Sequence, residues 1–242
     1  MGNFSIRTEN LEKNFGAVKA LNGVSFDFSA GLLHGIIGSD GAGKTTAMRL
    51  LAGLLKPSGG AIHYYNNGKP AAFGELRPSL AYMPQQASLY PDLSIDEHLE
   101  FFRELYCLDP AFYARRSAEL LEITRLDKFR GRRAGQLSGG MYKKLGLMCA
   151  LLQSPSVLLL DEPTNGVDPI SRREFWEMLY DLAADKILII ISTAYMDEAE
   201  RCSRVHLLDR GLLLGSGEPR AVLKENSAAK FEDIFISQGA GK

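Results

Sequence analysis

Hydrophobic residues near the N-terminus alternate with polar ones. Val24, Phe26 and Phe28 are each separated by one polar residue, and this period of two predicts a half-buried strand in an antiparallel sheet. Residues 32–38 instead form a continuous apolar run that ends in glycine, which predicts a strand buried on both faces. Residues 44–55 then repeat their apolar positions with helical spacing, so a helix follows this strand directly.

The rest of the pattern predicts strands and helices that alternate at both ends of the chain around a helical middle. The expected strands are 62–65, 80–83, 157–160 and 187–191, the expected helices are 170–184 and 196–203, and a hairpin is expected at 205–214. Residues 94–152 have a mostly helical pattern. This order predicts an α/β fold with a helical insertion.

Composition narrows the class of protein. A length of 242 residues suits one large domain, and a formal net charge of −1 gives no chain-wide basic surface, so we expect no nucleic-acid partner. The longest apolar stretch, residues 145–160, is interrupted by Pro155 and is shorter than the roughly 20 residues of a spanning helix. The three cysteines are scattered and the N-terminus has no apolar signal core, which predicts a cytosolic protein.

A phosphate-binding loop follows the first buried strand. Its sequence Gly-Ser-Asp-Gly-Ala-Gly-Lys-Thr matches G-x-x-x-x-G-K-[ST] between a predicted strand and a predicted helix. Glycines let backbone N–H groups turn inward around phosphate oxygens, and the helix N-terminus adds positive charge. The lysine can reach the β- and γ-phosphates, and the threonine hydroxyl is placed for Mg²⁺. The predicted nucleotide-binding residues are Gly38, Ser39, Asp40, Gly41, Ala42, Gly43, Lys44, Thr45 and Thr46.

Two carboxylates end the buried strand at 157–160. Asp161 stands at the carboxyl edge of the sheet, beside the phosphate loop, where it can hold Mg²⁺. Glu162 is then the group to polarise an attacking water as a general base. Taken alone, the two acids suit a solvated strand end equally well. Their combination with the phosphate loop favours the catalytic interpretation.

A second helix start is predicted at Leu137, Ser138, Gly139, Gly140 and Met141. Ser138 is a candidate N-cap, Leu137 a candidate hydrophobic staple, and the glycines leave backbone N–H groups uncovered. One triphosphate does not need two anion sites from one chain. A second anion site and an ordinary capped helix both remain open here, and these residues alone favour the capped helix.

In the order of its motifs the chain resembles the ATP-binding-cassette (ABC) ATPases. The LSGG sequence lies between the Pro-Gln of residues 84–85 and the LLLDEP strand, and the resemblance covers residues 6–219. It implies a P-loop NTPase core with an antiparallel β subdomain and an inserted helical signature subdomain at about 94–153. Residues 1–236 would form one ABC-type ATP-binding domain, and weak patterning predicts a disordered tail at 237–242.

The resemblance also implies roles for single residues. In the family, the signature at 137–141 of one chain covers the ATP held by the phosphate loop of a second cassette, which gives the second helix start a purpose. Gln85 resembles the glutamine that senses Mg²⁺ and the attacking water, and it joins Glu162 as a catalytic residue. Phe15 lies where the family stacks an aromatic ring on adenine, although its apolar side chain suits a core position equally well. Asp168 belongs to the loop that contacts the opposite cassette. The implied Mg²⁺ ligands are Thr45, Gln85 and Asp161.

One position departs from the family pattern. Residues 192–200 read Ser-Thr-Ala-Tyr-Met-Asp-Glu-Ala-Glu, where the family has a histidine third in the segment to orient the γ-phosphate and water. Ala194, at this switch position, cannot donate a hydrogen bond or carry charge. A positioned polar group typically contributes about 10²–10⁴-fold in rate. With Glu162 intact, we expect ATP hydrolysis that is measurable but weak.

Within the family, the amino-acid sequence of these motifs most resembles that of the drug-type exporter branch. This resemblance implies an ATP-hydrolysing subunit, or one module of a tandem protein, that powers a separate membrane-spanning permease by ATP-driven pairing with a second cassette. Such a chain would lie in the cytoplasm on the inner face of the cell membrane. The alternatives are a soluble ABC ATPase that acts on nucleic acid and a nucleotide-dependent regulator that hydrolyses weakly.

Several adjacent basic residues carry no motif of their own. Runs of charge usually mark solvated helix faces, and we interpret all four pairs in this way. The pairs are Arg115–Arg116, Arg132–Arg133, Lys143–Lys144 and Arg172–Arg173.

Overall fold

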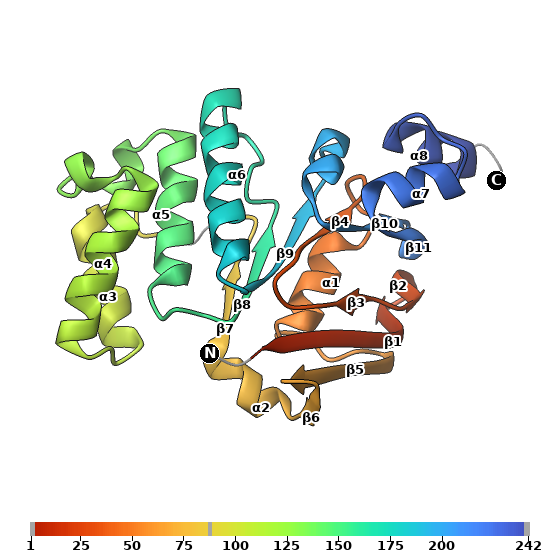
Figure 1. Ribbon diagram of the computed structural model, residues 1–242, viewed down its shortest axis with the longest axis horizontal. Helices are drawn as coiled ribbons and strands as arrows, with labels where there is room; N and C mark the ends of the chain where they lie inside the picture. The colour runs from red at the N-terminus through yellow and green to blue at the C-terminus, as the bar shows by residue number, and fades with distance from the viewer. Residues whose placement is uncertain (1–2, 87–88, 240–242) are drawn as a thin grey trace.

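An antiparallel sheet forms the N-terminal part of the computed structural model, which describes residues 3–86 and 89–239 (Figure 1). Its strands are β1 (Phe4–Phe15), β2 (Val18–Val24), β3 (Asp27–Phe28), β5 (Gly59–Asn66) and β6 (Lys69–Ala71). Their order is β2-β1-β5-β6, with β3 paired to β1 as well. This sheet confirms the expected antiparallel β subdomain.

A second sheet carries the chemistry at one edge. Its strands are β4 (Leu33–Ile37), β7 (Leu80–Met83), β8 (Val157–Asp161), β9 (Leu188–Thr193), β10 (Arg204–Asp209) and β11 (Leu212–Gly217). The order is β11-β10-β4-β9-β8-β7, and all neighbours are parallel except the β10–β11 hairpin. Because parallel strands end at one edge, the loop after β4 and the acids after β8 lie at the same side of the sheet.

Helix α1 (Lys44–Leu51) lies between the two sheets (Figure 1). Its buried Met48 and Leu51 belong to one hydrophobic cluster with Phe28 of the antiparallel sheet and Ile190 of the parallel sheet. The phosphate loop therefore starts a helix that is held from both sides.

Of the remaining helices, α2 (Phe73–Leu76) packs with α1 and the antiparallel sheet, and the others lie over the other face of the parallel sheet and at its ends. These others are α3 (Ile95–Leu105), α4 (Pro110–Thr124), α5 (Gly139–Leu151), α6 (Pro169–Ala184), α7 (Pro219–Glu225) and α8 (Phe231–Gly239). Helices α3, α4 and α5 lie side by side, away from the antiparallel sheet (Figure 1), and account for the predicted helical middle. They share one hydrophobic cluster with the parallel sheet, so the insertion is packed onto the core.

The structure corrects three details of the predicted pattern. Strand β1 was not predicted because buried Thr8 takes an inward position, where its hydroxyl donates to Val24 O at 3.2 Å and accepts from Phe26 N at 2.8 Å. Residues 196–203 contain a 3₁₀ helix, Met196–Arg201, because Cys202 is already extended as the chain enters β10. Residues 237–239 of the expected disordered tail belong to α8, and 240–242 lie outside the described residues.

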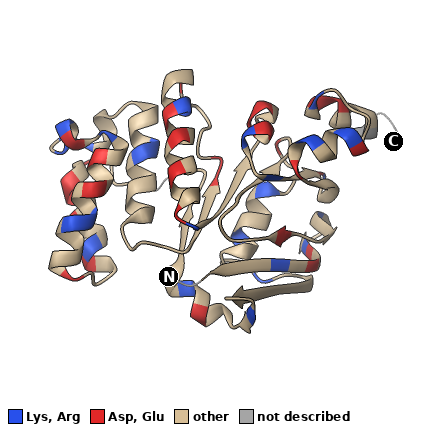
Figure 2. Cartoon of the chain, viewed as in Figure 1, with Lys and Arg blue, Asp and Glu red and all other residues tan. Residues whose placement is uncertain are grey.

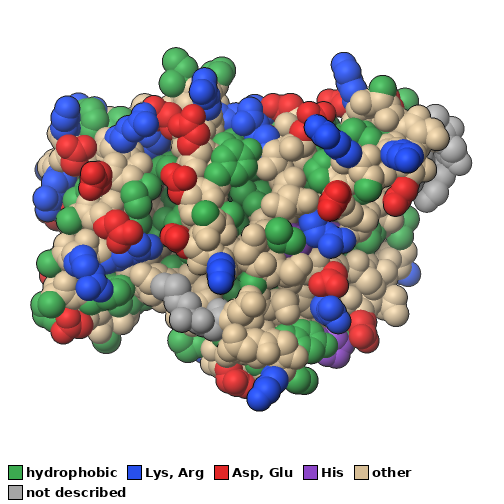
Figure 3. Space-filling model, viewed as in Figure 1, with side chains coloured by type: hydrophobic (Ala, Val, Ile, Leu, Met, Phe, Trp, Pro, Cys, Tyr) green, Lys and Arg blue, Asp and Glu red, His purple; other side chains and the backbone are tan. Residues whose placement is uncertain are grey.

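Charge is mixed over the surface of the molecule. Lys and Arg alternate with Asp and Glu along the helices (Figure 2), and both signs are interspersed on the face drawn in Figure 3. Within residues 3–86 and 89–239, no helix has the length and apolar character needed to cross a membrane.

Candidate nucleotide site

The phosphate loop leaves strand β4 and enters α1 through a tight glycine turn. Gly43 is the N-cap of α1 with φ 106°, and α1 has no side-chain cap. A Cβ on Gly43 would collide with the carbonyl oxygen of Ala20, and one on Gly38 would collide with that of Leu208. Both glycines are therefore required by close backbone approach, and the first N–H groups of α1 stay open to an anion.

Lys44 holds the loop in shape. Its side chain is only 4% exposed, and Nζ donates to Gly38 O at 2.9 Å and to Ser39 O at 3.0 Å. The ammonium group also pairs with the Glu162 carboxylate at 3.0 Å and lies 3.9 Å from that of Asp40. A buried cation thus lies between the phosphate loop and the candidate base.

Asp161 is fully buried at the end of β8. Its carboxylate accepts hydrogen bonds from Thr45 Oγ1 at 3.1 Å, Ser192 Oγ at 2.5 Å and the Tyr82 hydroxyl at 3.3 Å. Burial, helped by the charge of Asp161, raises the pKa of Tyr82 to about 12. Ser192 comes from β9, the strand between β4 and β8, and the segment at 192–200 gave it no predicted role.

Glu162 follows in a left-handed conformation, with φ 46°, and is 5% exposed. Its Oε1 pairs with Lys44, while Oε2 accepts from Gln85 Nε2 at 2.7 Å and Asn165 Nδ2 at 3.1 Å. Its backbone N–H donates to Ser192 O at 3.1 Å and Oγ at 3.0 Å. Asn165, in the loop that also holds Asp168, was not predicted as a partner of this carboxylate. Both oxygens of the Glu162 carboxylate are therefore fixed, one by the ion pair and one by hydrogen bonds. A general base needs such a fixed orientation.

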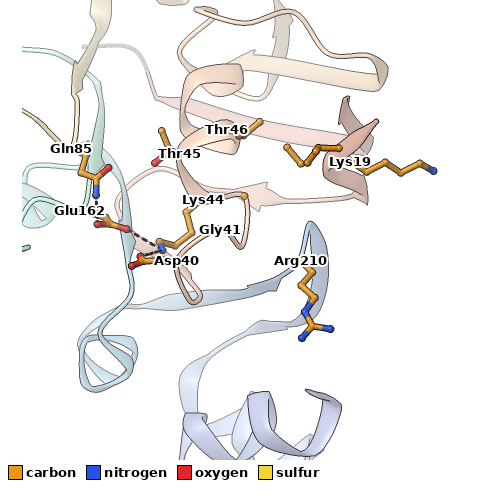
Figure 4. A pocket seen from close by; sticks show the side chains of 12 residues that line it. Lys19, Asp40, Gly41, Lys44, Thr45, Thr46, Gln85, Glu162 and Arg210 are labelled. Atoms are coloured by element: carbon orange, nitrogen blue, oxygen red, sulfur yellow. Dashed lines mark hydrogen bonds and ion pairs between the residues drawn. The ribbon is translucent and has the colours of Figure 1, made fainter. Parts of the chain in front are cut away.

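These groups surround a cavity of about 550 Å³ (Figure 4). The residues that line it are Val18, Lys19, Ala20, Asp40, Gly41, Gly43, Lys44, Thr45, Thr46, Gln85, Glu162 and Arg210. Lys19 and Arg210 were not predicted, and they flank the side of the cavity away from Glu162 (Figure 4). A concave site with backbone N–H groups and Lys44 at one end fits a nucleoside triphosphate.

Phe15 lies outside the lining of this cavity, at the end of β1. Its side chain is 49% exposed, so the core interpretation of this residue is wrong. The Lys13 ammonium lies 5.2 Å from the centre of its ring. An exposed ring facing Val18 across the β1–β2 turn is free to take a further planar partner.

The predicted signature is a separate site in this chain. Ser138 is the N-cap of α5 and its hydroxyl accepts from Met141 N at 3.3 Å. Ser138 and Gly139 are exposed, and neither lines the cavity at the phosphate loop. Gly140 is buried against Ser171, where a Cβ would collide with the serine side chain.

Comparison with known proteins identifies the fold and the family. The sequence pattern of the ABC transporter family matches residues 21–165. The chain is 45% identical over 233 residues to the probable multidrug ABC transporter ATP-binding protein YbhF of Escherichia coli, covering 96% of this chain and 40% of that protein. It is 35% identical over 227 residues to the Nod factor export ATP-binding protein I of Burkholderia orbicola, covering 93% and 75%. A solved ATP-binding subunit of an ABC transporter superposes with a TM-score of 0.82 at 30% identity, covering 96% and 98%.

The chain belongs to the ABC transporter family. It is an ATP-binding, ATPase domain of that family with the predicted P-loop NTPase core. The relatives favour a transporter domain over the two alternatives, a soluble nucleic-acid ATPase and a nucleotide-dependent regulator. The chain spans 40% of the length of the first curated relatives it matches.

The two remaining predicted site residues, Asp168 and Ala194, lie in different surroundings. Asp168 is the N-cap of α6, and hydrogen bonds led by the one from Ser171 N lower the pKa of its carboxyl group. Ala194 lines a cavity of about 200 Å³ together with Asp40, Glu162, Asn165, Thr193 and Tyr195. The methyl group of Ala194 offers this cavity no hydrogen bond, as expected.

The basic pairs are more varied than predicted. Arg173 is exposed, as a solvated face requires. Its neighbour Arg172 is largely covered and pairs with Asp197 and Glu198. For Lys143 and Lys144 the prediction is wrong, because both are buried, with 9% and 7% exposure. Helical periodicity turns these two lysines inward, where polar partners satisfy them.

Proposed function

We propose that this ABC domain hydrolyses ATP to power a multidrug-type exporter through a separate membrane-spanning permease. The observation that carries the proposal is the Glu162 carboxylate, held between Lys44 and Gln85 at the end of β8 beside the phosphate loop. The names of the relatives, a probable multidrug ABC transporter protein and a Nod factor export protein, support export.

Lys44 and Glu162 would exchange partners when ATP binds. The loop N–H groups and the Lys44 ammonium attract the phosphates, which compete with the carboxylate for this cation. Glu162 Oε1 is then free to accept a proton from an attacking water, while Gln85 and Asn165 keep Oε2 in place. The buried position of Glu162 keeps bulk water from competing for the carboxylate.

Thr45 and Asp161 form an oxygen-rich pair that fits Mg²⁺. Their side chains are 3.1 Å apart at the cavity edge, and Gln85 has its amide oxygen left over after its NH₂ group donates to Glu162. Magnesium prefers such oxygen ligands. When bound, the ion would neutralise charge on the phosphates, and Thr45, Asp161 and Gln85 would hold it.

A second cassette would complete the site. The exposed N–H groups around Ser138 and Gly139 suit the phosphates of ATP on another chain or another module, and Asp168 would contact that cassette. ATP would favour the paired state because it contacts both cassettes only when they are closed. The solved cbiO1 of Clostridium perfringens, 27% identical with a TM-score of 0.81, is titled as part of the complex cbiONQ. By analogy the chain would lie on the cytoplasmic face of the membrane, against its permease.

The hydrolysis would be slow because of Ala194. Turnover of Mg·ATP by the wild-type chain tests both parts of the proposal when compared with Glu162→Gln. We expect measurable turnover in the wild type, a loss of about 10²-fold or more in Glu162→Gln, and ATP binding at least as tight as in the wild type, because the carboxylate that competes for Lys44 is gone.

Size-exclusion chromatography provides the second measurement. Glu162→Gln should accumulate an ATP-dependent dimer. Tight ATP binding without turnover in the wild type would contradict the proposed hydrolysis. Turnover that Glu162→Gln leaves intact would remove Glu162 from the mechanism.

A further inference from the structure

Two adjacent lysines of α5 are buried for different reasons. Lys143 and Lys144 lie one turn beyond Ser138 on the same helix. Lys144 forms an ion pair with Glu174 of α6 at 2.6 Å, and Arg125 pairs with the same carboxylate at 2.9 Å. Lys144 therefore has the carboxylate partner that a buried cation usually takes.

Lys143 has no such direct carboxylate partner among the contacts that the structure describes. Its Nζ donates to the backbone oxygen of Gln85 at 2.8 Å and to that of Glu162 at 3.4 Å. Burial lowers the pKa of its ammonium group, while the nearby charges of Glu162 and Asp161 act in the opposite direction. The buried ammonium group of Lys143 thus binds the main chain of Gln85 and Glu162, the two residues proposed to act on the attacking water.

The three residues form a closed ring of hydrogen bonds. Lys143 binds the backbone of Gln85 and of Glu162, and the Gln85 side chain binds the Glu162 carboxylate at 2.7 Å. Gln85 follows β7 and Glu162 follows β8, so the lysine joins two strand ends to a helix. Lys143 of α5 therefore helps to set the orientation of the Glu162 carboxylate.

Helix α5 also carries the exposed N-terminus at Ser138 and Gly139. A helix of this length moves as a stiff body, because its backbone hydrogen bonds are internal. A ligand that shifts the Ser138 end must therefore shift Lys143, and with it the ring around Glu162.

We propose that Lys143 is a positioning residue that couples the exposed N-terminus of α5 to Gln85 and Glu162. The inference rests on the proposed function, since it assigns Glu162 and Gln85 to hydrolysis. Occupation of the α5 N-terminus would then be transmitted within one chain to its own hydrolytic site, over a path of one helical turn and two backbone carbonyls.

Steady-state kinetics of three variants test the catalytic part. Lys143→Met keeps the apolar stem and removes the ammonium, so kcat should fall by about 10–100-fold, as for lost outer partners of a site, while KM stays within about threefold. Lys143→Arg restores a cation and should recover part of the loss. Lys144→Met is the matched control, expected to lower thermal stability and to leave kcat within about twofold. Should Lys143→Met prove insoluble, Lys143→Gln takes its place with the same expected direction.

Two kinetic results would overturn the proposal. One is a folded Lys143→Met with kcat within twofold of wild type. The other is an equal loss of kcat in Lys144→Met, which would reduce both lysines to a structural role.

Hydrogen–deuterium exchange tests the coupling without turnover. At a protein concentration where size exclusion shows only monomer, so that no second chain covers the α5 N-terminus, a non-hydrolysable ATP analogue with Mg²⁺ should slow amide exchange in residues 38–46 of every variant, and in residues 139–144 of the wild type and Lys144→Met. In Lys143→Met the second effect should disappear while the first remains. Equal protection of 139–144 in Lys143→Met would overturn the proposal. A wild type with no protection at 38–46 binds no nucleotide, and that result would overturn the proposed function together with this inference.

Discussion

Two helices of this chain begin in the same type of glycine-rich sequence and reach opposite arrangements. Helix α1 starts at Gly43 in a left-handed conformation without a side-chain cap, beside Lys44 and the acids of β8. Helix α5 starts at Ser138, whose hydroxyl accepts from Met141 N, and its N-terminus is exposed. At α1 the backbone donors and the groups proposed to be catalytic meet within one chain, whereas at α5 none of those proposed groups among the described residues faces the outer end.

The difference lies in what surrounds each helix. Helix α1 is fixed between two sheets, so its N-terminus can only face the edge where β4 and β8 end. Helix α5 is packed among α3, α4, α6 and the strand β7, while Ser138 and Gly139 at its N-terminus are exposed, and it reaches the site through Lys143. A glycine-rich helix N-terminus thus forms a complete phosphate site at α1 and half of a site at α5.

The largest effect should come from removing the cation at α1. Lys44→Ala should weaken ATP binding by about 10–100-fold, the loss of a hydrogen bond to a charged group of about 1.5–3 kcal/mol. It also leaves Glu162 as an unpaired buried charge, which typically destabilises by about 3–5 kcal/mol. Isothermal titration and urea unfolding measure the two quantities.

The double variant Lys44→Ala/Glu162→Gln is the control for this prediction. It should recover most of the stability and none of the ATP affinity. If it stays as unstable as Lys44→Ala, the buried pair is not the cause of the loss.

Filling the cavity at the switch position should raise the rate. Ala194→His places a polar ring in the cavity of about 200 Å³ beside Glu162 and Asn165. We expect kcat for Mg·ATP to rise by about 10²-fold, the lower end of the usual effect of a positioned polar group. Ala194→Leu fills the same space without a hydrogen bond and should give no gain. An equal gain in both variants would assign the effect to packing.

Removing the side-chain cap of α5 should have two distinct effects, one on stability and one on ATP-dependent dimerisation. Ser138→Ala should cost about 1 kcal/mol in the free energy of unfolding and leave ATP affinity at the phosphate loop unchanged. In a Glu162→Gln background it should also abolish the ATP-dependent dimer.

Asp109 caps α4 in the same way, accepting from Ala111 N and Phe112 N at 3.0 Å. Asp109→Ala is therefore the matched control, with a similar loss of stability and an intact dimer. Loss of the dimer in both variants would mean that stability alone limits pairing.

The smallest effect is expected at the rim of the phosphate loop. Asp40 is 93% exposed and lies 3.9 Å from the Lys44 ammonium, where its charge opposes that of a triphosphate. Asp40→Asn should tighten ATP binding about threefold at low salt, in the usual range for an exposed pair. The gain should shrink as salt screens the charge, and a gain that is independent of salt would point to a change in loop geometry.

Much of the fold was predictable because its signals are local. The buried runs before the phosphate loop and before Asp161 predict the central strands, and the parallel order follows from alternation with helices. Strand β1 escaped because Thr8 breaks its apolar alternation, and its hydroxyl is satisfied only by Val24 and Phe26. The inward turn of Lys143 and Lys144 escaped because two adjacent charges normally mark solvent.

The sequence by itself determined the phosphate loop, since its donors are the backbone N–H groups of consecutive residues and its glycines are required locally. The carboxylate proposed as the general base could be predicted for a similar reason, because it follows the end of a buried strand. Only the tertiary structure decided what holds that acid. Gln85, Ser192 and Lys143 come from β7, β9 and α5, and the order of strands in the sheet brings them together. The motif resemblance named Gln85 but not its contact with Glu162. Side chains far apart along the chain meet only when the core packs, so no local pattern could reveal these contacts.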